Sequence, residues 1–596
     1  MELHWFDITI IIVYLIGVIL IGFWLRKRAS EDIASYFLGS REVPWYVLGV
    51  SNASSMFDIT GTMWLVYVIF VYGLKGAWLP WLWPTFNQVF LMIFLAVWIR
   101  RSNVITGAEW ITTRFGAGRG GELSRISVVI FALVSVVGFM TYVYQGIGRF
   151  AAVFLPWDWA PSTYSIILMA ITTIYVILGG MYSVVLTDVI QFVMLAIGSV
   201  VVGWIAITKI SPADIAAVTP DGWKDLFFGW TLQLDWGNLI PEVNDRIVQD
   251  GYNLFTIIMM MILFKGILVS LAGPAPNYDM QRVLATRKPK ESAMMSGMVS
   301  VALFPRWLLI TGATVLGLVF YSPQLRAMGE NLDLEMVFPY VINNFIPVGV
   351  VGIMIAGLLA AYMSTFDSTV NAGAAYLVND IYARYIKPGA SSRQNMLMSY
   401  LASIGIVLAG ILFGSMARSI NDVMQWIVSG LYGGYTAPNI LKWYWWRFNG
   451  YGYFWGMIAG VAASLLFPTL FPDMLPLYGF PFILLLSGAA CVIGSLMTPP
   501  DKEEVLKSFY KSVRPWGFWG HVHRLVKRED PDFQRNTSFG RDMLNVAVGI
   551  IWQLSIVIIP IYLIIQSFRE FWISVAILLV TSVFLKKNWY DKLEEY

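Results

Sequence analysis

Long apolar stretches separated by short polar ones occupy nearly the whole chain. Because a helix needs about 20 apolar residues to cross the hydrocarbon core of a bilayer, we expect each stretch to be a transmembrane helix. The pattern predicts about fifteen of them, at residues 5–25, 45–72, 77–99, 126–148, 163–179, 184–207, 254–279, 298–321, 348–382, 396–415, 423–444, 452–471, 477–497, 543–565 and 570–585. The expected fold class is therefore an all-α polytopic membrane protein in contact with the lipid bilayer.

The composition agrees with this class and excludes several others. Hydrophobic residues make up 58% of the 596 residues and charged residues 13%, which is too apolar for a soluble multidomain chain. A net charge of +3 gives no sign of nucleic-acid binding, and the single cysteine, Cys491, excludes an intrachain disulfide. None of the three histidines lies in a predicted span, so haem ligation and an HExxH metalloprotease are unsupported. We do not expect an enzyme.

The basic residues indicate the orientation of the chain. Of the 40 Lys and Arg residues, 30 fall in the loops on one side of the predicted membrane and 8 in the loops on the other. Since basic loops stay in the cytoplasm, an odd number of spans places the N-terminus outside and the C-terminus inside the cell, in a plasma or inner membrane. The acidic segment 208–253 then forms an extracellular cap. The cytoplasmic segment 498–542 is expected to form a short helix followed by an interfacial loop.

Two predicted spans are interrupted by residues that weaken a helix. One contains SNASSMFDITGT at Ser51–Thr62, and the other contains GPAPNYD at Gly273–Asp279, where prolines free backbone carbonyls. Close helix packing and a simple proline kink are the alternative interpretations. The interrupted spans begin two consecutive sets of five helices with opposite orientation. This arrangement is typical of inverted-repeat transporters, which bind solute and ions beside broken helices near the membrane midplane.

The same pattern divides the chain into seven parts. These are an N-terminal extra helix with a cytoplasmic loop (1–44), the first five-helix repeat (45–207), the extracellular loop (208–253), the inverted second repeat (254–444), two additional helices (445–497), the cytoplasmic loop (498–542), and two C-terminal helices with a short tail (543–596).

The densest polar cluster inside a span lies at Ala360–Gly373. Ser364, Asp367 and Ser368 share one helix face, and Thr365 is adjacent to it. Oxygen-bearing side chains in a membrane suit a hard cation, although each hydroxyl could instead bond back to a carbonyl four residues earlier. Asp188, in the span 184–207, would neutralise a monovalent ion.

Five motifs carry a resemblance to the sodium:solute symporter family. They are SNAS at Ser51–Ser54, TGAEWITTRFG at Thr106–Gly116, GGMYSVVLTDVIQ at Gly179–Gln191, QRVLATRKPKES at Gln281–Ser292, and AAYMSTFDSTVNAGAAYLVNDIY at Ala360–Tyr382. The resemblance covers roughly residues 1–500. It implies the five-plus-five inverted-repeat fold and sodium-coupled import of a small polar organic solute by alternating access.

The resemblance also implies where sodium would bind. The main site would use backbone carbonyls of Val50, Ala53 and Ala361 with the hydroxyls of Ser364 and Thr365. A further site found in some members would here involve Asp188, Ser364, Asp367 and Ser368. Asp367 stands where those members have a hydroxyl, so either two cations occupy the region or one carboxylate holds a proton.

The solute is less constrained. Most of the polar side chains that hold sugars in the family have no counterpart here. Trp81 and Trp426 could nevertheless stack on a sugar ring, and Asn52, Asp58 and Gln425 could bind its hydroxyls. We expect a sugar or polyol; an amino acid, sialic acid or another carboxylate is the alternative, and a channel or transporter-like sensor also remains open. Asp58 with Arg306 or Lys265 could equally form a structural ion pair. The candidate solute-binding residues are Asn52, Phe57, Asp58, Trp81, Asn277, Tyr278, Gln425 and Trp426.

Overall fold

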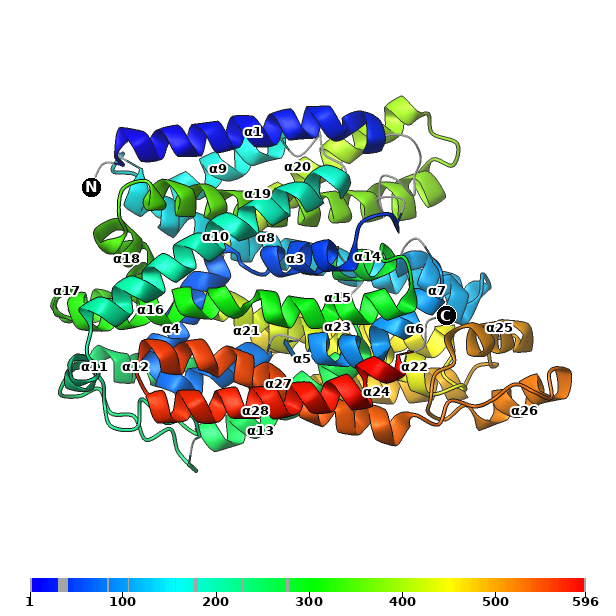
Figure 1. Cartoon of the computed structure of the whole chain (residues 1–596). Helices are drawn as coiled ribbons and strands as arrows, with labels where there is room; N and C mark the ends of the chain where they lie inside the picture. Colours follow the sequence, from blue (N-terminus) through cyan, green and yellow to red (C-terminus); the bar gives the residue numbers. More distant parts are fainter. Residues whose placement is uncertain are drawn as a thin grey trace.

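The structure, a computed structural model, is built from helices packed side by side (Figure 1). It describes residues 3–29, 41–82, 85–104, 107–155, 157–175, 181–227, 229–274 and 278–593. Within these residues, ten helices are long and apolar enough to cross a membrane, and two shorter apolar helices, Trp5–Gly17 and Thr256–Ala272, add to them. The all-α polytopic class predicted from the hydrophobic pattern is confirmed.

The first half of the chain contains two helices before the 208–253 segment that are assembled from several pieces. The first is α3 with α4, and the second is α5 with η3 and α6, where η3 is a π-helical turn. The elements are α1 (Trp5–Ala29), α3 (Trp45–Ser55), α4 (Ile59–Tyr72), η2 (Gly73–Leu82), α5 (Thr85–Phe90), η3 (Leu91–Leu95), α6 (Ala96–Arg101), α7 (Gly107–Phe115), α8 (Arg119–Phe154), α9 (Pro161–Tyr175), α10 (Met181–Lys209), α11 (Pro212–Val218) and α12 (Glu242–Asp250).

The second half begins with α13 and ends with the long helices α27 and α28. The elements are α13 (Phe255–Ala272), α14 (Tyr278–Leu284), α15 (Pro289–Ala302), α16 (Phe304–Phe320), α17 (Ser322–Met328), η5 (Gly329–Asn331), η6 (Leu334–Met336), α18 (Val337–Phe345), α19 (Val350–Ala375), η7 (Tyr376–Ile386), α20 (Ser392–Met416), α21 (Ile420–Gln425), η8 (Trp426–Leu431), α22 (Tyr432–Tyr444), α23 (Gly450–Leu470), α24 (Pro476–Leu496), α25 (Glu503–Val513), α26 (Gly520–Glu529), α27 (Phe539–Ile564), α28 (Phe568–Asn588) and η9 (Tyr590–Lys592).

Both predicted helix breaks are present. The first broken helix stops at Ser55 and restarts at Ile59, where the Asp58 side chain caps the new helix by accepting a hydrogen bond from the Gly61 N–H at 3.0 Å. The second stops at Ala272, and α14 begins at Tyr278. The Pro274 carbonyl next to this second break accepts a hydrogen bond from the Tyr435 hydroxyl at 3.0 Å. The polar and proline-containing stretches therefore interrupt the helices as expected.

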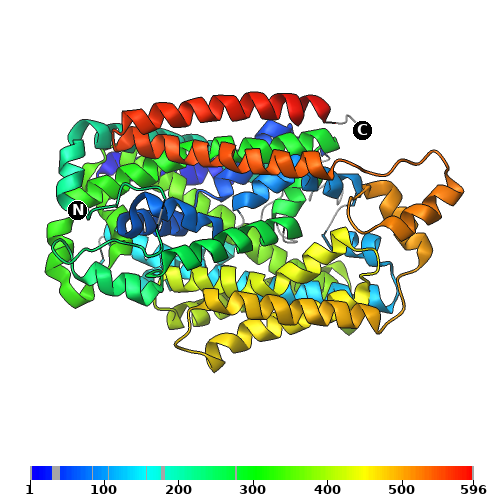
Figure 2. The ribbon, with the colours of Figure 1, turned by 90° about the horizontal axis from the view of Figure 1, so that it is seen from below.

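The two ends of the helix bundle carry different connecting segments. In Figure 1 the N-terminus lies at the end where α11, α12, α17 and α18 are found, and the C-terminus lies at the opposite end with α7, α25 and α26. The last two long helices, α27 and α28, contact each other along one side of the bundle (Figure 2). The two termini therefore lie at opposite ends of the bundle.

The segment 208–253 packs as a cap on the end of α4 and η2. The indole nitrogens of Trp223 and Trp236 donate to the carbonyls of Phe70 and Val71 at 2.9 and 3.2 Å, and these carbonyls belong to the last turn of α4. Tryptophan donors thus satisfy backbone acceptors at the end of a helix.

At the end of the same cap, Asp250 joins three elements. Its buried carboxylate accepts hydrogen bonds from the hydroxyls of Tyr72 (2.6 Å) and Tyr67 in α4 and from the Asn421 amide in α21 (2.9 Å). The Asn421 carbonyl oxygen in turn accepts from the Trp64 indole at 2.9 Å. The cap is therefore tied to the second half of the first broken helix and to α21.

The segment 498–542 differs from its prediction. It contains two helices, α25 and α26, where one helix and an interfacial loop were expected. Val522 and Val526, four residues apart on α26, are both buried. They form a short apolar face, and the burial of this face stabilises the second helix. We call residues 498–542 the aromatic cap because its aromatic side chains pack against the bundle. The rings of Trp516 and Tyr444 stack with their centres 4.9 Å apart, and the Trp519 indole donates to the Trp443 carbonyl at 2.8 Å.

Arg114, in α7, anchors the aromatic cap to the bundle. Its side chain is fully buried and donates to the backbone carbonyls of Lys442, Trp445 and Phe448 at 2.8, 3.2 and 2.9 Å. It also pairs with Asp501 at 3.4 Å. One guanidinium thus joins α7, the turn between α22 and α23, and the start of the aromatic cap.

Candidate functional site

The break between α3 and α4 places the carbonyl end of a short helix inside the bundle. The Ala53 and Ser54 carbonyls at this end accept from Met56 N–H and Phe57 N–H at 3.1 and 3.0 Å. The C-terminal end of a helix carries a partial negative charge, which favours a cation. Val50 and Ala53, two predicted carbonyl ligands, lie in the last two turns of this helix, and Ala53 is fully buried.

The polar face of α19 lies against this helix. α3 and α19 are in contact, and Ala361 and Thr365 are both buried on α19. The Thr365 hydroxyl oxygen has no hydrogen-bond partner among the residues that the structure describes. A buried hydroxyl without a partner is costly in an apolar interior, and a bound cation would relieve that cost. The donor set consists of oxygen atoms only, as a hard monovalent cation requires, so these residues fit sodium.

Asp188, from α10, lies at the centre of a second cluster. It is fully buried and accepts from the Ser51 hydroxyl at 2.6 Å and from the Ser364 hydroxyl at 2.9 Å. Ser364 uses its hydrogen in this bond and keeps its oxygen lone pairs for another contact. The structure therefore brings Ser364, which was predicted for both sodium sites, together with Asp188, as the family resemblance implies.

Arg282 is a buried charged residue that the sequence analysis did not assign to this cluster. Its guanidinium is 3.0 Å from the Asp188 carboxylate, and the two side chains are 3% and 0% exposed. It also donates to the Ser55 hydroxyl at 2.8 Å and lies 3.4 Å from the Asn52 amide oxygen. The charge distribution had counted Arg282 with the basic residues of a cytoplasmic loop, but it is buried in α14, within the second broken helix.

Asp367 and Ser368 lie on the same helix as Ser364 and are half-buried. Asp367 accepts a hydrogen bond from the Asn371 amide one turn further along α19. Ser368 is not among the residues that hydrogen-bond Asp188 in the described part of the chain. Of the predicted second cluster, Ser364 is thus the member bonded to Asp188.

Asp58 forms an ion pair at the first helix break. Besides capping α4, it accepts from the Tyr142 hydroxyl at 2.6 Å and pairs with Arg306 of α16 at 3.4 Å. The Arg306 guanidinium also lies 5.9 Å from the centre of the Phe57 ring. Lys265, the other cation considered, is buried elsewhere, over the Phe480 ring. Of the two cations that the sequence left open for Asp58, the structure therefore selects Arg306.

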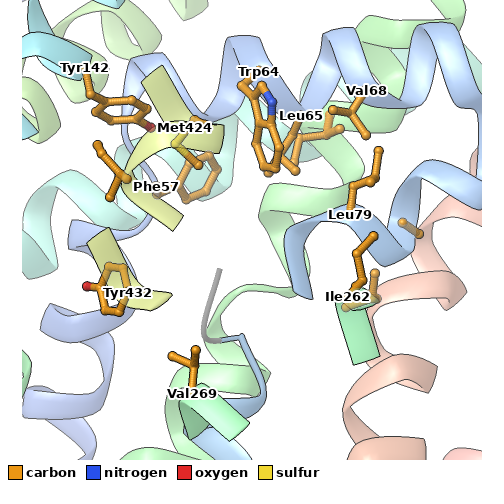
Figure 3. Packing of buried hydrophobic residues seen from close by; sticks show 14 of the residues in the cluster. Phe57, Trp64, Leu65, Val68, Leu79, Tyr142, Ile262, Val269, Met424 and Tyr432 are labelled. Carbon is orange, nitrogen blue, oxygen red and sulfur yellow. The ribbon is translucent and has the colours of Figure 1, made fainter. Parts of the chain in front are cut away.

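The remaining solute-site candidates are only partly described. Asn52 is buried beside Arg282, and Trp426 is half-buried with its ring against Gly138 of α8. Figure 3 shows Phe57, Tyr142 and Met424 on one side of this region, in the same packed cluster as Trp64. Asn277 and the side chains of Trp81, Tyr278 and Gln425 lie outside the described residues.

Comparison with known proteins decides the family. The sequence model of the sodium:solute symporter family matches residues 36–460 of the chain. The chain belongs to this family.

Several sequence relatives are sugar and polyol transporters. Sodium/glucose cotransporter 4 of Danio rerio is 25% identical over 588 residues, which cover 88% of this chain and 83% of that protein. The sodium/mannose cotransporter of Bos taurus is 26% identical, covering 83% of this chain and 87% of that protein. The human sodium/myo-inositol cotransporter is 25% identical, covering 87% of this chain and 76% of that protein.

A solved structure confirms the fold. A sodium-coupled sialic acid symporter, in a substrate-bound outward-open state, matches with a TM-score of 0.63 at 17% identity, covering 84% of this chain and 99% of that one. The five-plus-five inverted-repeat fold predicted from the helix breaks is therefore correct, and this symporter-family chain is a multi-pass membrane protein.

Proposed function

We propose that this symporter-family protein imports a neutral polyhydroxylated solute, a sugar or a polyol, together with sodium. The observation that carries the choice of solute is the Asp58–Arg306 ion pair at the first helix break. A paired carboxylate and guanidinium give a site with no net charge that still offers hydrogen-bond donors and acceptors. Hydroxyl groups use both, and the Phe57 ring beside Arg306 provides an apolar surface for the carbon face of a sugar.

The same pair disfavours a carboxylate solute. An anionic solute needs an available cation, but Arg306 is engaged by Asp58 and Arg282 is engaged by Asp188. Taking Arg282 from its partner would leave the buried Asp188 carboxylate without compensation, which costs about 3 to 5 kcal/mol. Taking Arg306 from its partner would leave the half-buried Asp58 carboxylate unpaired. The buried nitrogen atom Nε of Arg306 has no hydrogen-bond partner among the described residues and could donate to a solute hydroxyl without breaking the pair.

We place the coupled sodium ion between α3 and α19. Val50, Ala53 and Ala361 would offer backbone carbonyls, and Ser364 and Thr365 would offer hydroxyls; the partnerless Thr365 hydroxyl supports this assignment. A sodium ion bound there would attract oxygen atoms of both helices and so hold the carbonyl end of α3 against the polar face of α19. Because α3 leads directly into the break that carries Asp58, sodium binding that fixes the position of α3 would also fix the position of the solute-binding residues at the break.

The charge distribution supports an orientation of the chain in the membrane. With 30 of 40 basic residues on the side that includes α7 and the aromatic cap, we assign that end to the cytoplasm and the N-terminus to the outside of a plasma or inner membrane. A sodium ion that enters down an inside-negative potential of 100 mV supplies about 2.3 kcal/mol, before its concentration gradient is counted. This energy suffices for uphill import. The sugar, mannose and myo-inositol cotransporters among the relatives agree with this class of solute.

The test is sodium-driven uptake by the purified protein in proteoliposomes. The panel contains glucose, mannose and myo-inositol as neutral solutes, an amino acid as a zwitterion, and sialic acid as an anion. We expect uptake of at least one neutral solute only when an inward sodium gradient is present, and none by a Ser364→Ala, Thr365→Ala double variant. Preferential uptake of sialic acid or of the amino acid would overturn the choice of solute. Flux that is independent of the sodium gradient would indicate a channel.

A further inference from the structure

The helix α4 and the short helix α21 lie against each other between the first helix break and the cap formed by residues 208–253. We propose that these two helices form an extracellular gate over the solute site, and that Asp250 is a latch that holds the gate closed when its carboxyl is protonated. This inference rests on the proposed import of a solute, because it concerns how the solute reaches the first break from outside.

Two successive side-chain contacts fill the space between α4 and α21. Nearest the break, Met424 of α21 lies in the same packed cluster as Phe57 (Figure 3). Further along α4, the Trp64 indole donates to the side-chain oxygen of Asn421 at 2.9 Å. All four side chains are buried. A solute therefore cannot pass between these helices until α21 separates from α4.

Asp250 holds the outer ends of both helices. One of its carboxylate oxygens accepts from the hydroxyls of Tyr67 and Tyr72 on α4, and the other accepts from the Asn421 amide on α21 at 2.9 Å. Asn421 is thus bonded to α4 through Trp64 and to the cap through Asp250. Separation of α21 from α4 must break these bonds, and it would bring water to the Asp250 carboxyl.

A second buried carboxylate binds the beginning of α21, but its charge is balanced. Glu335 of η6 accepts from the Ile420 N–H at 2.9 Å and forms an ion pair with Arg149 of α8. Asp250 instead receives its hydrogen bonds from neutral donors, and it has no ion-pair partner in the described part of the chain. A buried carboxylate without a cation favours its protonated form. Of the two carboxylates on α21, Asp250 is therefore the one that responds to pH.

The surroundings of Asp250 set the direction of this response. Burial raises the pKa of its carboxyl from 3.8 to about 6, while its tyrosine hydrogen bonds and the charge of Arg246 oppose the rise. Water in the open gate would restore the lower pKa, so the closed gate binds the proton more tightly than the open gate does. A fall of the external pH through 6 therefore favours the closed gate. The titratable and charged groups that face Asp250 are Tyr67 and Tyr72 on α4, Arg246 and Tyr252 on its own segment, and Asp422 on α21.

Thiol accessibility measures the gate without any solute. In a Cys491→Ala background, Met424→Cys places a thiol beneath the latch, and Val248→Cys places a reference thiol on α12, where Val248 is 65% exposed. A membrane-impermeant thiol reagent is added outside proteoliposomes in the presence of sodium. The ratio of the two modification rates corrects for the pH dependence of thiol chemistry and for the orientation of the protein in the vesicles.

We expect this ratio to be about tenfold higher at pH 7.5 than at pH 5, because ionised Asp250 favours the open gate. Asp250→Asn is neutral at both pH values and should give a low ratio at both. Asp245→Asn, which replaces an exposed carboxylate on the same helix, is the matched control and should keep the response to pH. A ratio that does not change with pH when Asp250 is present, or one that changes equally in Asp250→Asn, would overturn the proposal.

A second variant covers the case in which Asp250→Asn does not fold. Asn421→Ala removes the bonds of α21 to Trp64 and to Asp250, so the thiol at position 424 should react faster than in the parent protein at pH 5. An unchanged rate would contradict the latch. Because modification needs no solute, a wrong solute class leaves this test intact. Failure of every solute in the uptake panel would instead count against the proposed function, while the modification rates stay interpretable.

Discussion

The carboxylate of Asp7 accepts a hydrogen bond from the backbone N–H of Gly352, 345 residues further along the chain, at 2.8 Å. The same oxygen accepts from the Gly349 N–H at 2.7 Å, so the first helix caps the beginning of α19. A side chain at Gly352 would meet the Asp7 backbone at 2.7 Å, which explains the glycine at this contact. A buried carboxylate at a helix N-terminus compensates the unpaired amides and the positive end of the helix dipole. The helix that carries the proposed sodium ligands is thereby fixed to α1.

Replacing this cap should weaken the protein. Asp7→Ala leaves two buried amides unpaired, and we expect a loss of about 1 to 2 kcal/mol in the free energy of unfolding. Asp7→Asn keeps an acceptor oxygen and should lose less. Thermal unfolding of the detergent-solubilised protein compares the three. Equal melting temperatures for Asp7→Ala and wild type would show that the cap contributes nothing.

The main sodium site makes a sharper prediction. Removing both hydroxyls with Ser364→Ala, Thr365→Ala should abolish sodium-driven uptake while the protein still folds, because alanine favours the helix. Thr365→Ser keeps the oxygen and should retain coupling. Thr369→Ala, one turn along α19, removes a hydroxyl that bonds back to the Thr365 carbonyl and serves as the matched control. Full sodium dependence in a well-expressed double variant would refute the assignment.

The ion pair at the first helix break predicts a change of solute preference. Asp58→Asn should leave Arg306 with an uncompensated positive charge, so binding of the neutral solute should fall at least tenfold and binding of an anionic analogue should improve. Asp58→Asn with Arg306→Gln restores neutrality and should recover part of the binding of the neutral solute. Competition by the matching sugar and sugar acid measures both effects. If the three proteins rank the two solutes alike, the pair has no part in selecting charge.

Asp250 predicts a pH dependence of stability. Burial raises the pKa of its carboxyl from 3.8 to about 6. The folded protein therefore binds this proton more tightly than the unfolded chain, so the ionised group opposes folding above pH 6. That cost is relieved as the pH falls through 6 and is absent below the unfolded value, a change on the order of 3 kcal/mol.

Asp250→Asn removes the titration and isolates this contribution. Relative to wild type, the variant should be more stable at pH 7.5 than at pH 5, because the wild-type carboxylate is ionised only at the higher pH. Thermal unfolding at both pH values tests this relation. A melting-temperature difference that is the same at pH 5 and pH 7.5 would contradict it. The comparison with wild type cancels the effect of Asp501, whose pKa burial also raises to about 6.

Among the residues that hold the aromatic cap against the bundle, Arg114 should cause the largest loss of stability when it is replaced. Arg114→Gln leaves three backbone carbonyls and Asp501 without their donor, so we expect a loss of about 3 to 5 kcal/mol. Adding Asp501→Asn removes the stranded carboxylate and should recover part of that loss. Thermal unfolding, followed by proteolysis of the cap, distinguishes local release from global destabilisation. Wild-type protease resistance in Arg114→Gln would mean that the cap is held by its aromatic contacts alone.

The sequence predicted the features that depend on neighbouring residues. The small and polar run at Ser51–Thr62 and the prolines at Gly273–Asp279 weaken a helix locally, and both breaks occur there. The shared face of Ser364, Asp367 and Ser368 follows from helical spacing, and the structure places Ser364 against Asp188. The breaks and the shared helix face needed no knowledge of distant contacts, whereas the pairing of Ser364 with Asp188 was implied by the family resemblance.

Features that depend on distant residues escaped prediction. Arg282 lies beside a basic loop in sequence and was counted with it, but its partner Asp188 is 94 residues away, and no local pattern marks that pairing. The second helix of the aromatic cap was missed for a related reason. Val522 and Val526 are too few to indicate an amphipathic helix until the surface that buries them is known.

The aromatic cap has a consequence for the synthesis of the protein. Trp443 contacts both Trp98 and Trp110 at one end of the bundle, and Trp516 and Phe509, which contact Trp98 and Trp110, are made later. During translation the earlier helices therefore leave the ribosome with this aromatic surface uncovered. The end of the bundle is completed only once residues beyond 519 have emerged, so a nascent chain arrested before that point should expose the surface to chaperones and membrane proteases, while one arrested after α26 should be protected.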